Sequence, residues 1–195
     1  NKIKIYEDIF YVKELSAIEC DTRERNLLSK FMGDGGWHIQ IDSDEYFLDF
    51  EGFLTYLKTL DISKPTQVYA KWITLYKKDR DGYLYTDSDE VFPVATNVPD
   101  YNLCRGSAIG KIIYTDFKAL HQSWARSEEE IAFKLKNWGH KTDFNVEAYF
   151  QFWKAVNKDT YRYVRSFHPL DGWIWQALEY APSLDMPTVI DLVKQ

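Results

Sequence analysis

Residues 67–92, QVYAKWITLYKKDRDGYLYTDSDEVF, carry the clearest structural pattern in the N-terminal half of the chain. The two halves of this stretch, 67–77 and 83–92, are dense in the Tyr, Val, Ile, Leu and Thr residues that favour β-strands. Between them, the run DRDG at 79–82 supplies the residue types of a tight turn. We therefore predict a β-hairpin whose strands are long enough to anchor a sheet.

The remaining elements of the first 117 residues follow from shorter patterns. Ser16 and Glu19 have the spacing of a capping box, which predicts a helix over 17–32. Apolar residues at helical spacing predict a second helix from Phe50 to Leu60, and Pro and Gly residues predict a loop over 93–110. Runs rich in Ile, Tyr, Phe or Val predict further strands at 3–12, 37–41 and 111–117.

Helical patterns dominate from residue 118 onward. Ser127 and the three glutamates that follow it form a capping box, so a helix begins there, with Gly139 as the residue that ends it. Three more helices are predicted: one starting near Thr142 or Asp143, one from Asp171 through Ala181, and a short one with Pro187 in its first turn.

Early strands followed by late helices predict an α+β fold. We expect an antiparallel sheet in the N-terminal and central part with packed helices, and a mostly helical C-terminal part. The length of 195 residues predicts a single domain over 1–195, sheet-rich in 1–117 and helix-rich in 118–195.

The composition excludes several classes of protein. With 45% hydrophobic residues and no apolar run of membrane-spanning length, the chain is neither disordered nor an integral membrane protein. Residues 1–8 lack the apolar run of a secretory signal. We therefore expect a cytoplasmic protein without membrane contact.

The charge is negative and unevenly distributed. The net charge of −6 argues against a dedicated nucleic-acid-binding protein. Residues 1–100 carry 12 Lys and Arg against 19 Asp and Glu, whereas residues 101–195 carry 12 against 11. The acidic half is therefore the better candidate for contact with a basic partner.

The residues that usually perform catalysis form no recognisable constellation. Cys20 and Cys104 are too few for a disulfide framework or a thiolate metal site, and the four histidines lack metal-ligand spacing. We accordingly assign no catalytic residue, no metal ligand and no cofactor.

One acidic pattern, Asp-Ser-Asp-Glu-x-Phe, occurs twice, at 42–47 and at 87–92. Two carboxylates separated by one residue at the end of a strand can bind a divalent cation, which favours a metal-dependent transferase or hydrolase that uses Asp42 and Asp44. The same residues are also typical of turns and helix caps. The cation site and the turn or helix cap both stay open as interpretations, and the turn or helix cap is the simpler.

Aromatic and basic residues are interleaved over 144–175. Such a segment suits a helical core, a protein interface, or stacking against single-stranded nucleic acid. One helix cannot bury Tyr149, Phe150, Phe152 and Trp153 along one narrow stripe, so some of these rings must face another element or a partner.

We therefore expect a non-enzymatic protein that binds another protein, such as an acidic inhibitor or an immunity or anti-defence protein. Its acidic clusters suit a basic partner. Single-stranded nucleic acid is the less favoured partner, and the metal-dependent enzyme is the alternative from another class. The expected partner-binding residues are Asp42, Asp44, Glu45, Asp87, Asp89, Glu90, Trp153, Tyr161 and Tyr163.

Overall fold

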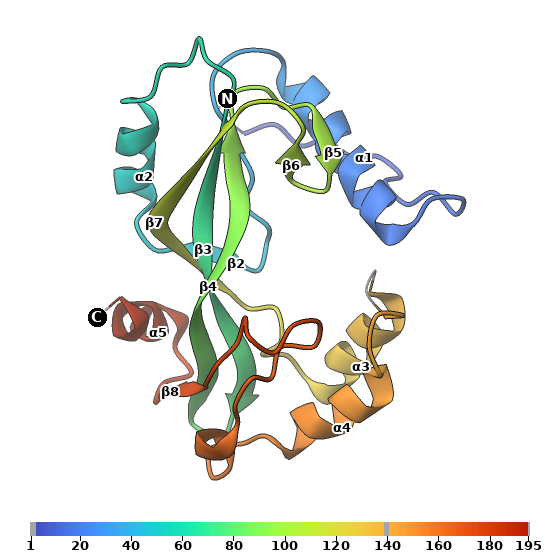
Figure 1. Ribbon diagram of the computed structural model, residues 1–195, viewed down its shortest axis with the longest axis vertical. Helices are drawn as coiled ribbons and strands as arrows, with labels where there is room; N and C mark the ends of the chain where they lie inside the picture. Colours follow the sequence, from blue (N-terminus) through green and yellow to red (C-terminus); the bar gives the residue numbers. More distant parts are fainter. Residues whose placement is uncertain (1–2, 139–140, 195) are drawn as a thin grey trace. The chain divides into compact units, whose positions relative to one another are not determined.

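The computed structural model describes residues 3–138 and 141–194 of the chain, and within them it confirms the α+β class (Figure 1). The chain divides into two compact units. Unit 1 consists of the described residues up to Gln40, of Glu51–Ala70 and of Phe92–Thr115; unit 2 consists of Ile41–Phe50, Lys71–Val91 and the described residues from Asp116 onward. Three long strands contribute residues to both units: β3 (Thr66–Asp79), β4 (Gly82–Thr96) and β7 (Lys111–His121).

The strands form a mixed sheet in the order β1-β4-β3-β7-β2, with β8 also paired to β4. The pairs β1 (His38–Ile39) with β4, β2 (Glu45–Phe47) with β7, and β8 (Glu179–Ala181) with β4 are all antiparallel. β7 runs parallel to β3, because the amide of Lys111 donates to the carbonyl of Pro65 at 2.9 Å and that of Trp124 donates to Leu75 at 3.2 Å. The predicted hairpin of β3 and β4 and the predicted strand at 111–117 are confirmed.

Unit 1 is organised around α1 (Ala17–Met32). The predicted capping box is present, and Gly33, at φ 88°, ends the helix. α1 packs against the small hairpin of β5 (Tyr101–Leu103) and β6 (Gly106–Ser107), where Asn26 exchanges two hydrogen bonds with the backbone of Tyr101. Most of α2 (Phe50–Leu57) also belongs to this unit, as do Cys20 and Cys104, which are free thiols.

The strand predicted at 3–12 is wrong, because no strand of the described chain pairs with this segment and its backbone has no regular structure. Ile3, Ile5 and Ile9 are exposed. The segment is held instead by the Arg23 guanidinium, which donates to the carbonyl of Ile9 at 2.9 Å. Alternating apolar residues favour an extended backbone, but a strand also needs a partner edge.

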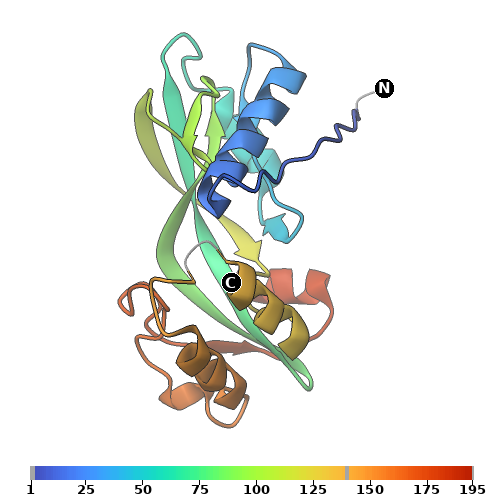
Figure 2. The same cartoon turned by 90° about the vertical axis from the view of Figure 1, so that its right-hand side faces the viewer.

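Unit 2 holds α3 (Glu128–Asn137) and α4 (Val146–Ala155), which pack against each other (Figure 2). Both helices begin at a capping residue. Ser127 forms the expected capping box of α3, and Asn145 caps α4 a few residues after the predicted start. η1 (Tyr161–Tyr163), β8 and α5 (Met186–Val193) complete the unit, and Pro187 lies in the first turn of α5 as predicted. Gly139, the predicted end of the first of these helices, lies outside the described residues.

The helix predicted from Asp171 through Ala181 is wrong. The backbone there pairs with an earlier segment, because Ser166 and Phe167 donate to the carbonyls of Gln176 and Trp175 at 3.2 and 3.1 Å. The segment then continues into β8. The C-terminal part is therefore less helical than we expected, since it combines helices with β8 and an irregular stretch before it.

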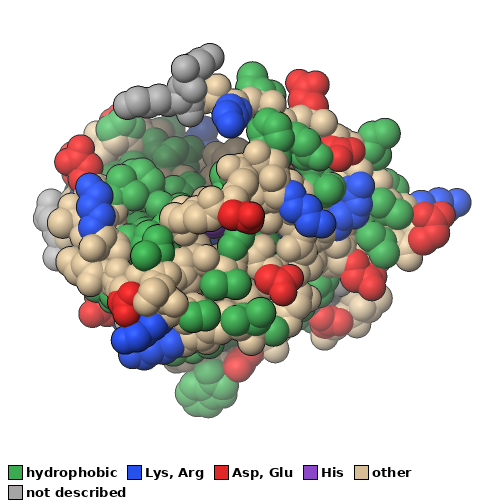
Figure 3. Space-filling model, turned by 90° about the horizontal axis from the view of Figure 1, so that it is seen from above, with side chains coloured by type: hydrophobic (Ala, Val, Ile, Leu, Met, Phe, Trp, Pro, Cys, Tyr) green, Lys and Arg blue, Asp and Glu red, His purple; other side chains and the backbone are tan. Residues whose placement is uncertain are grey.

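Acidic and basic side chains are interspersed with hydrophobic ones on the face drawn in Figure 3. That face carries no broad field of one charge. No helix among the described residues is long and apolar enough to cross a membrane.

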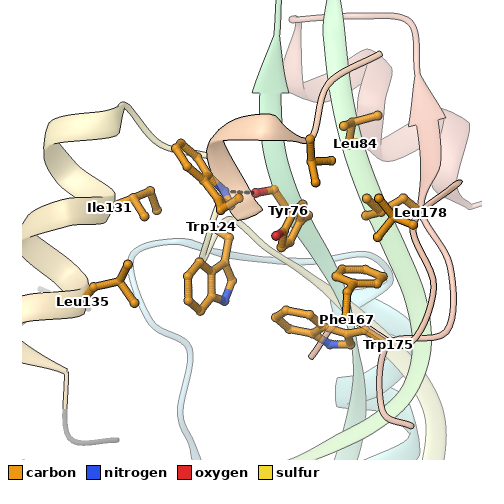
Figure 4. Close-up of a cluster of buried hydrophobic side chains, with 11 residues drawn as sticks. Tyr76, Leu84, Trp124, Ile131, Leu135, Phe167, Trp175 and Leu178 are labelled. Carbon is orange, nitrogen blue, oxygen red and sulfur yellow. Dashed lines mark hydrogen bonds between the residues drawn. The ribbon is translucent and has the colours of Figure 1, made fainter. Parts of the chain in front are cut away.

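The core of unit 2 has two parts, one on each face of its strands. Tyr76 and Leu84 belong to the first part, where they meet α3, α4 and the rings of Trp124, Phe167 and Trp175 (Figure 4). The neighbouring residues Leu75 and Tyr83 belong to the second part, which Val189 of α5 covers. Side chains alternate along a strand, so the hairpin sequence buries both of its faces.

Candidate functional site

Unit 2 contains a cleft of about 930 Å³ beside β4. One side consists of β4 residues and of two lysines from β3 and β7, and the other side consists of the irregular segment that leads into β8 and of Glu179. The lining residues are Lys71, Thr86, Asp87, Ser88, Asp89, Glu90, Val91, Lys118, Trp173, Ile174, Gln176, Ala177 and Glu179.

The cleft is acidic, because its lining includes four carboxylates against two ammonium groups. Lys118 Nζ pairs with Asp87 Oδ2 at 2.6 Å. Lys71 Nζ lies 3.2 Å from Asp89 Oδ1 and 3.1 Å from Asp116 Oδ1, and its hydrogen bonds to these carboxylates raise the pKa of Lys71. One ammonium group thus serves two carboxylates, and the side chain of Asp89 is 97% exposed.

Glu90 connects the cleft with the aromatic core. Its Oε2 accepts a hydrogen bond from Trp175 Nε1 at 2.9 Å. Burial raises the pKa of the Glu90 carboxyl, while the bond from Trp175 and the charge of Lys134 act in the opposite direction. The ionisation of Glu90 in the cleft therefore depends on Trp175 of the core.

Lys134 of α3 is the second ionisable group with an unusual environment. Its Nζ donates to the backbone carbonyl of Ser123 at 3.0 Å and lies 4.7 Å from the ring centre of Trp124. Burial lowers the pKa of Lys134 to about 8. Perturbed groups of this kind often mark functional sites, although structural ones occur too.

The outer edge of β4 is open beside the cleft. β8 pairs with β4 only at Tyr83, Leu84 and Tyr85. Within the part of unit 2 that the structure describes, no strand pairs with this edge at residues 86–91. The amide of Glu90 donates to the hydroxyl of Ser88 at 3.4 Å, which is a contact within the strand itself.

Trp173 is the aromatic residue in the lining of the cleft, and 80% of its surface is accessible. Its backbone amide donates to Asp171 Oδ1 at 3.0 Å, so Asp171, predicted to cap a helix, orders a turn instead. The sequence placed Trp173 only in a general aromatic segment. Its position beside the acidic residues depends on how 165–177 folds back on itself.

The first acidic motif, at 42–47, has a different role from the second. Glu45 is buried, and its carboxylate accepts hydrogen bonds from Trp72 Nε1 at 3.1 Å and from the amide of Asp42 at 3.0 Å. Asp44 Oδ2 pairs with the Arg126 guanidinium at 2.6 Å. In this motif residues 42–44 form a turn and residues 45–47 form β2, whereas the second motif lies wholly within β4.

A metal centre at these acidic residues finds no geometric support. No group of three His, Cys, Asp or Glu side chains within 3–138 and 141–194 is arranged to hold a metal ion. Asp42 and Asp44 lie in the turn before β2, while Asp87 and Asp89 are paired with Lys118 and Lys71.

The three aromatic residues expected at an interface lie in different environments. Trp153 is 1% exposed and donates through Nε1 to the carbonyl of Tyr76 at 3.0 Å, so it belongs to the core. Tyr161 packs against that core, and Tyr163 is 86% exposed. Tyr161 and Tyr163 line a hollow of about 330 Å³ together with Lys158 and Arg162, which is separate from the acidic cleft.

Comparison of the chain with protein-family models, with curated proteins and with solved structures finds no match in any of the three. The function must therefore be inferred from the chemistry of the cleft.

Proposed function

We propose that this protein binds a basic segment of a partner protein in the cleft beside β4. The observation that carries the proposal is the combination of four carboxylates, two lysines and an exposed tryptophan in one cleft of about 930 Å³. Clefts lined mainly by one sign of charge concentrate ligands of the opposite sign.

The arrangement of ion pairs leaves negative charge for such a partner. Lys71 is shared between Asp89 and Asp116, both of which are almost fully exposed. An incoming lysine or arginine side chain would complete the pairing of Asp89, and complementary charge of this kind steers association and selects partners.

Trp173 supplies the apolar anchor. Tryptophan is enriched among the residues that contribute most to protein–protein binding. Its exposed ring also offers a face for a guanidinium or ammonium group, which is attracted to the electron-rich side of an aromatic ring. We infer that Trp173 and the carboxylates contact the same basic segment, as in an acidic inhibitor or immunity protein that captures its target.

The two other functions considered from the sequence have less support. The carboxylate of Asp44, needed for the metal-dependent enzyme, is engaged by Arg126. Of the two aromatic residues that could stack on single-stranded nucleic acid, Trp153 is in the core, whereas Tyr163 is exposed but lies outside the acidic cleft. No specific observation favours either function over protein binding.

A peptide-binding measurement tests the proposal. The probe is a fluorescent hexapeptide of alternating lysine and valine, titrated with the protein at physiological salt and followed by anisotropy. We expect saturable binding that weakens about tenfold or more in Trp173→Ala and in the double variant Asp87→Asn/Asp89→Asn. The matched control is Asp159→Asn/Asp191→Asn, which removes the same charge from exposed positions outside the cleft.

The control pair should bind the peptide within about threefold of the original protein, because long-range charge is screened beyond about 8 Å at this salt concentration. An equal loss in both double variants would show unspecific charge attraction and overturn the proposal. The same conclusion would follow if the peptide did not bind at all.

A further inference from the structure

We propose that the basic segment binds as an added β-strand along the outer edge of β4 at residues 86–91. This inference rests on the proposed function and specifies how the partner is held. Strand addition to an open sheet edge is a common mode of peptide recognition, in which the main chain supplies affinity and alternate side chains supply specificity.

The first argument is the interruption in pairing along β4. Residues 86–91 are in strand conformation, yet β8 ends its pairing at Tyr85. Asp87, Asp89 and Val91 are exposed at this edge. An unpaired edge presents N–H and C=O groups that can pair with another chain.

The second argument is the direction of the backbone groups. The carbonyl of Val94 accepts from the amide of Gln40 at 2.9 Å, so this β4 residue directs its backbone groups to the edge opposite β3. Glu90 lies four residues earlier in the same strand, and its amide donates to Ser88 Oγ within that strand. Alternate residues of a strand direct their backbone groups to the same edge. Thr86, Ser88 and Glu90 therefore offer their N–H and C=O groups to an added strand.

The third argument concerns space. The cleft lies between the edge of β4 and the segment that contains Trp173, Ile174, Gln176 and Ala177. An added strand would lie about 4.8 Å from β4, and six residues of it would extend about 20 Å. It would continue the sheet from the point where β8 stops.

The charges select the sequence of the added strand. Asp87 and Asp89 are two residues apart, so their side chains lie on the same face of the sheet. Residues opposite them in an added strand are also two apart, and lysine or arginine at both positions gives favourable cross-strand pairs. The occupant is therefore a partner segment with basic residues at every second position and small or apolar residues between them.

Backbone methylation of the probe distinguishes strand addition from other binding modes. Two versions of the lysine–valine hexapeptide are compared, one methylated on the amide nitrogens of the lysines and one on those of the valines. Only one set of amides can face β4 in an added strand. We expect one version to bind about tenfold or more weakly than the unmodified peptide, and the other to bind within about threefold.

Equal binding of the two methylated versions would overturn strand addition. The proposed function would still stand in that case, provided that the unmodified peptide bound in a manner dependent on Asp87 and Asp89. Failure of the unmodified peptide to bind would instead overturn the proposed function. The two failures are therefore distinguishable.

Amide hydrogen exchange gives a second readout on the protein itself. The amides of Ser88 and Glu90 should exchange rapidly in the free protein and at least about tenfold more slowly with saturating peptide, because they become hydrogen-bonded in the new pair. The amide of Leu84, already within the segment paired with β8, should change little. Bound peptide without protection of Ser88 and Glu90 would contradict an added strand.

A second copy of this chain is the competing occupant. Residues 2–5 read KIKI, which has the same alternation, and residues 3–12 carry no regular structure. Sedimentation of the free protein decides this point: we expect a monomer. A dimer that the lysine–valine peptide dissociates would show that the edge is occupied by another copy and would overturn a foreign partner.

Discussion

The indole N–H of Trp175 donates to the carboxylate of Glu90 at 2.9 Å, across 85 positions of the sequence. Trp175 is part of the aromatic core, whereas Glu90 lines the acidic cleft. A charged carboxylate near an apolar core is costly unless it accepts hydrogen bonds. The core of unit 2 therefore determines how readily one carboxylate of the cleft ionises.

Removal of this bond should raise the pKa of Glu90. Burial already raises it, and the Trp175 bond is the principal opposing effect. In Trp175→Phe the aromatic packing is largely retained but the donor is lost, so the charged form loses its stabilisation. A carbon-detected NMR titration of the glutamate side chains should show Glu90 titrating at higher pH than in the unaltered protein.

Trp173→Phe is the matched control, because Trp173 is two residues away and is exposed to solvent. It should leave the pKa of Glu90 where it was. An unchanged Glu90 titration in Trp175→Phe would mean that the bond contributes nothing to the ionisation of this carboxylate.

Lys134 should make the stability of the protein depend on alkaline pH. Below pH 8 the side chain is protonated in both the folded and the unfolded state, and burial of its charge destabilises the fold. Between pH 8 and 10.5 the folded state releases the proton while the unfolded state keeps it, so the free energy of unfolding rises. At 1.36 kcal/mol per pKa unit, the lowering from 10.5 to about 8 corresponds to about 3 kcal/mol.

Denaturant unfolding of the unaltered protein and of Lys134→Met measures this effect. From pH 7 to 10.5, the free energy of unfolding of the unaltered protein should rise by about 3 kcal/mol relative to that of Lys134→Met. Lys136→Met, an exposed substitution on the same helix, is the matched control for the loss of a lysine from α3. A constant difference for Lys134→Met would rule out a buried, destabilising ammonium group.

The elements that the sequence predicted well are those with local signals. The β3–β4 hairpin has its turn and both strands in one stretch, and the helices after Ser16 and Ser127 have capping boxes. The predictions failed where pairing with another segment of the chain determines the secondary structure. Residues 3–12 have strand-like alternation without a strand to pair with, and the segment after Asp171 pairs with Ser166 and Phe167.

The candidate site shows the same limit. Asp87, Asp89 and Glu90 were identified from a repeated motif, yet the first copy of that motif forms a turn around buried Glu45. Lys71, Lys118 and Trp173 were not singled out, because their contribution requires three strands and a folded-back segment. The local sequence signal of the open β4 edge was the alternation of acidic residues, Asp87 and Asp89, along the second strand of the predicted hairpin.

Trp153 and Tyr163 should respond very differently to substitution, although both lie in the aromatic segment. Trp153→Ala should destabilise the protein by about 3–5 kcal/mol, because it leaves a cavity and removes the donor to the carbonyl of Tyr76. Tyr163→Ala should change stability by no more than about 0.5 kcal/mol, since the side chain is exposed. Urea unfolding would measure both values. Similar losses for the two variants would disprove this assignment of core and surface.

The cap of α3 provides a last test. Ser127 Oγ accepts the amide of Glu130 at 3.2 Å, and the Glu130 carboxylate accepts the amide of Ser127 at 2.9 Å, which lowers the pKa of Glu130. Ser127→Ala leaves the Glu130 amide without this acceptor, and loss of such a cap typically costs about 1 kcal/mol.

Ser127→Asp is the matched variant, because aspartate also accepts the N3 amide and places a negative charge at the positive end of the helix dipole. It should unfold at nearly the same urea concentration as the unaltered protein, whereas Ser127→Ala should unfold earlier. Because α3 carries Ile131 and Leu135 into the core and Lys134 toward Glu90, the cap supports the same packing that sets the charge of the cleft. Equal stability of the alanine and aspartate variants would show that the capping bond does not hold α3 in place.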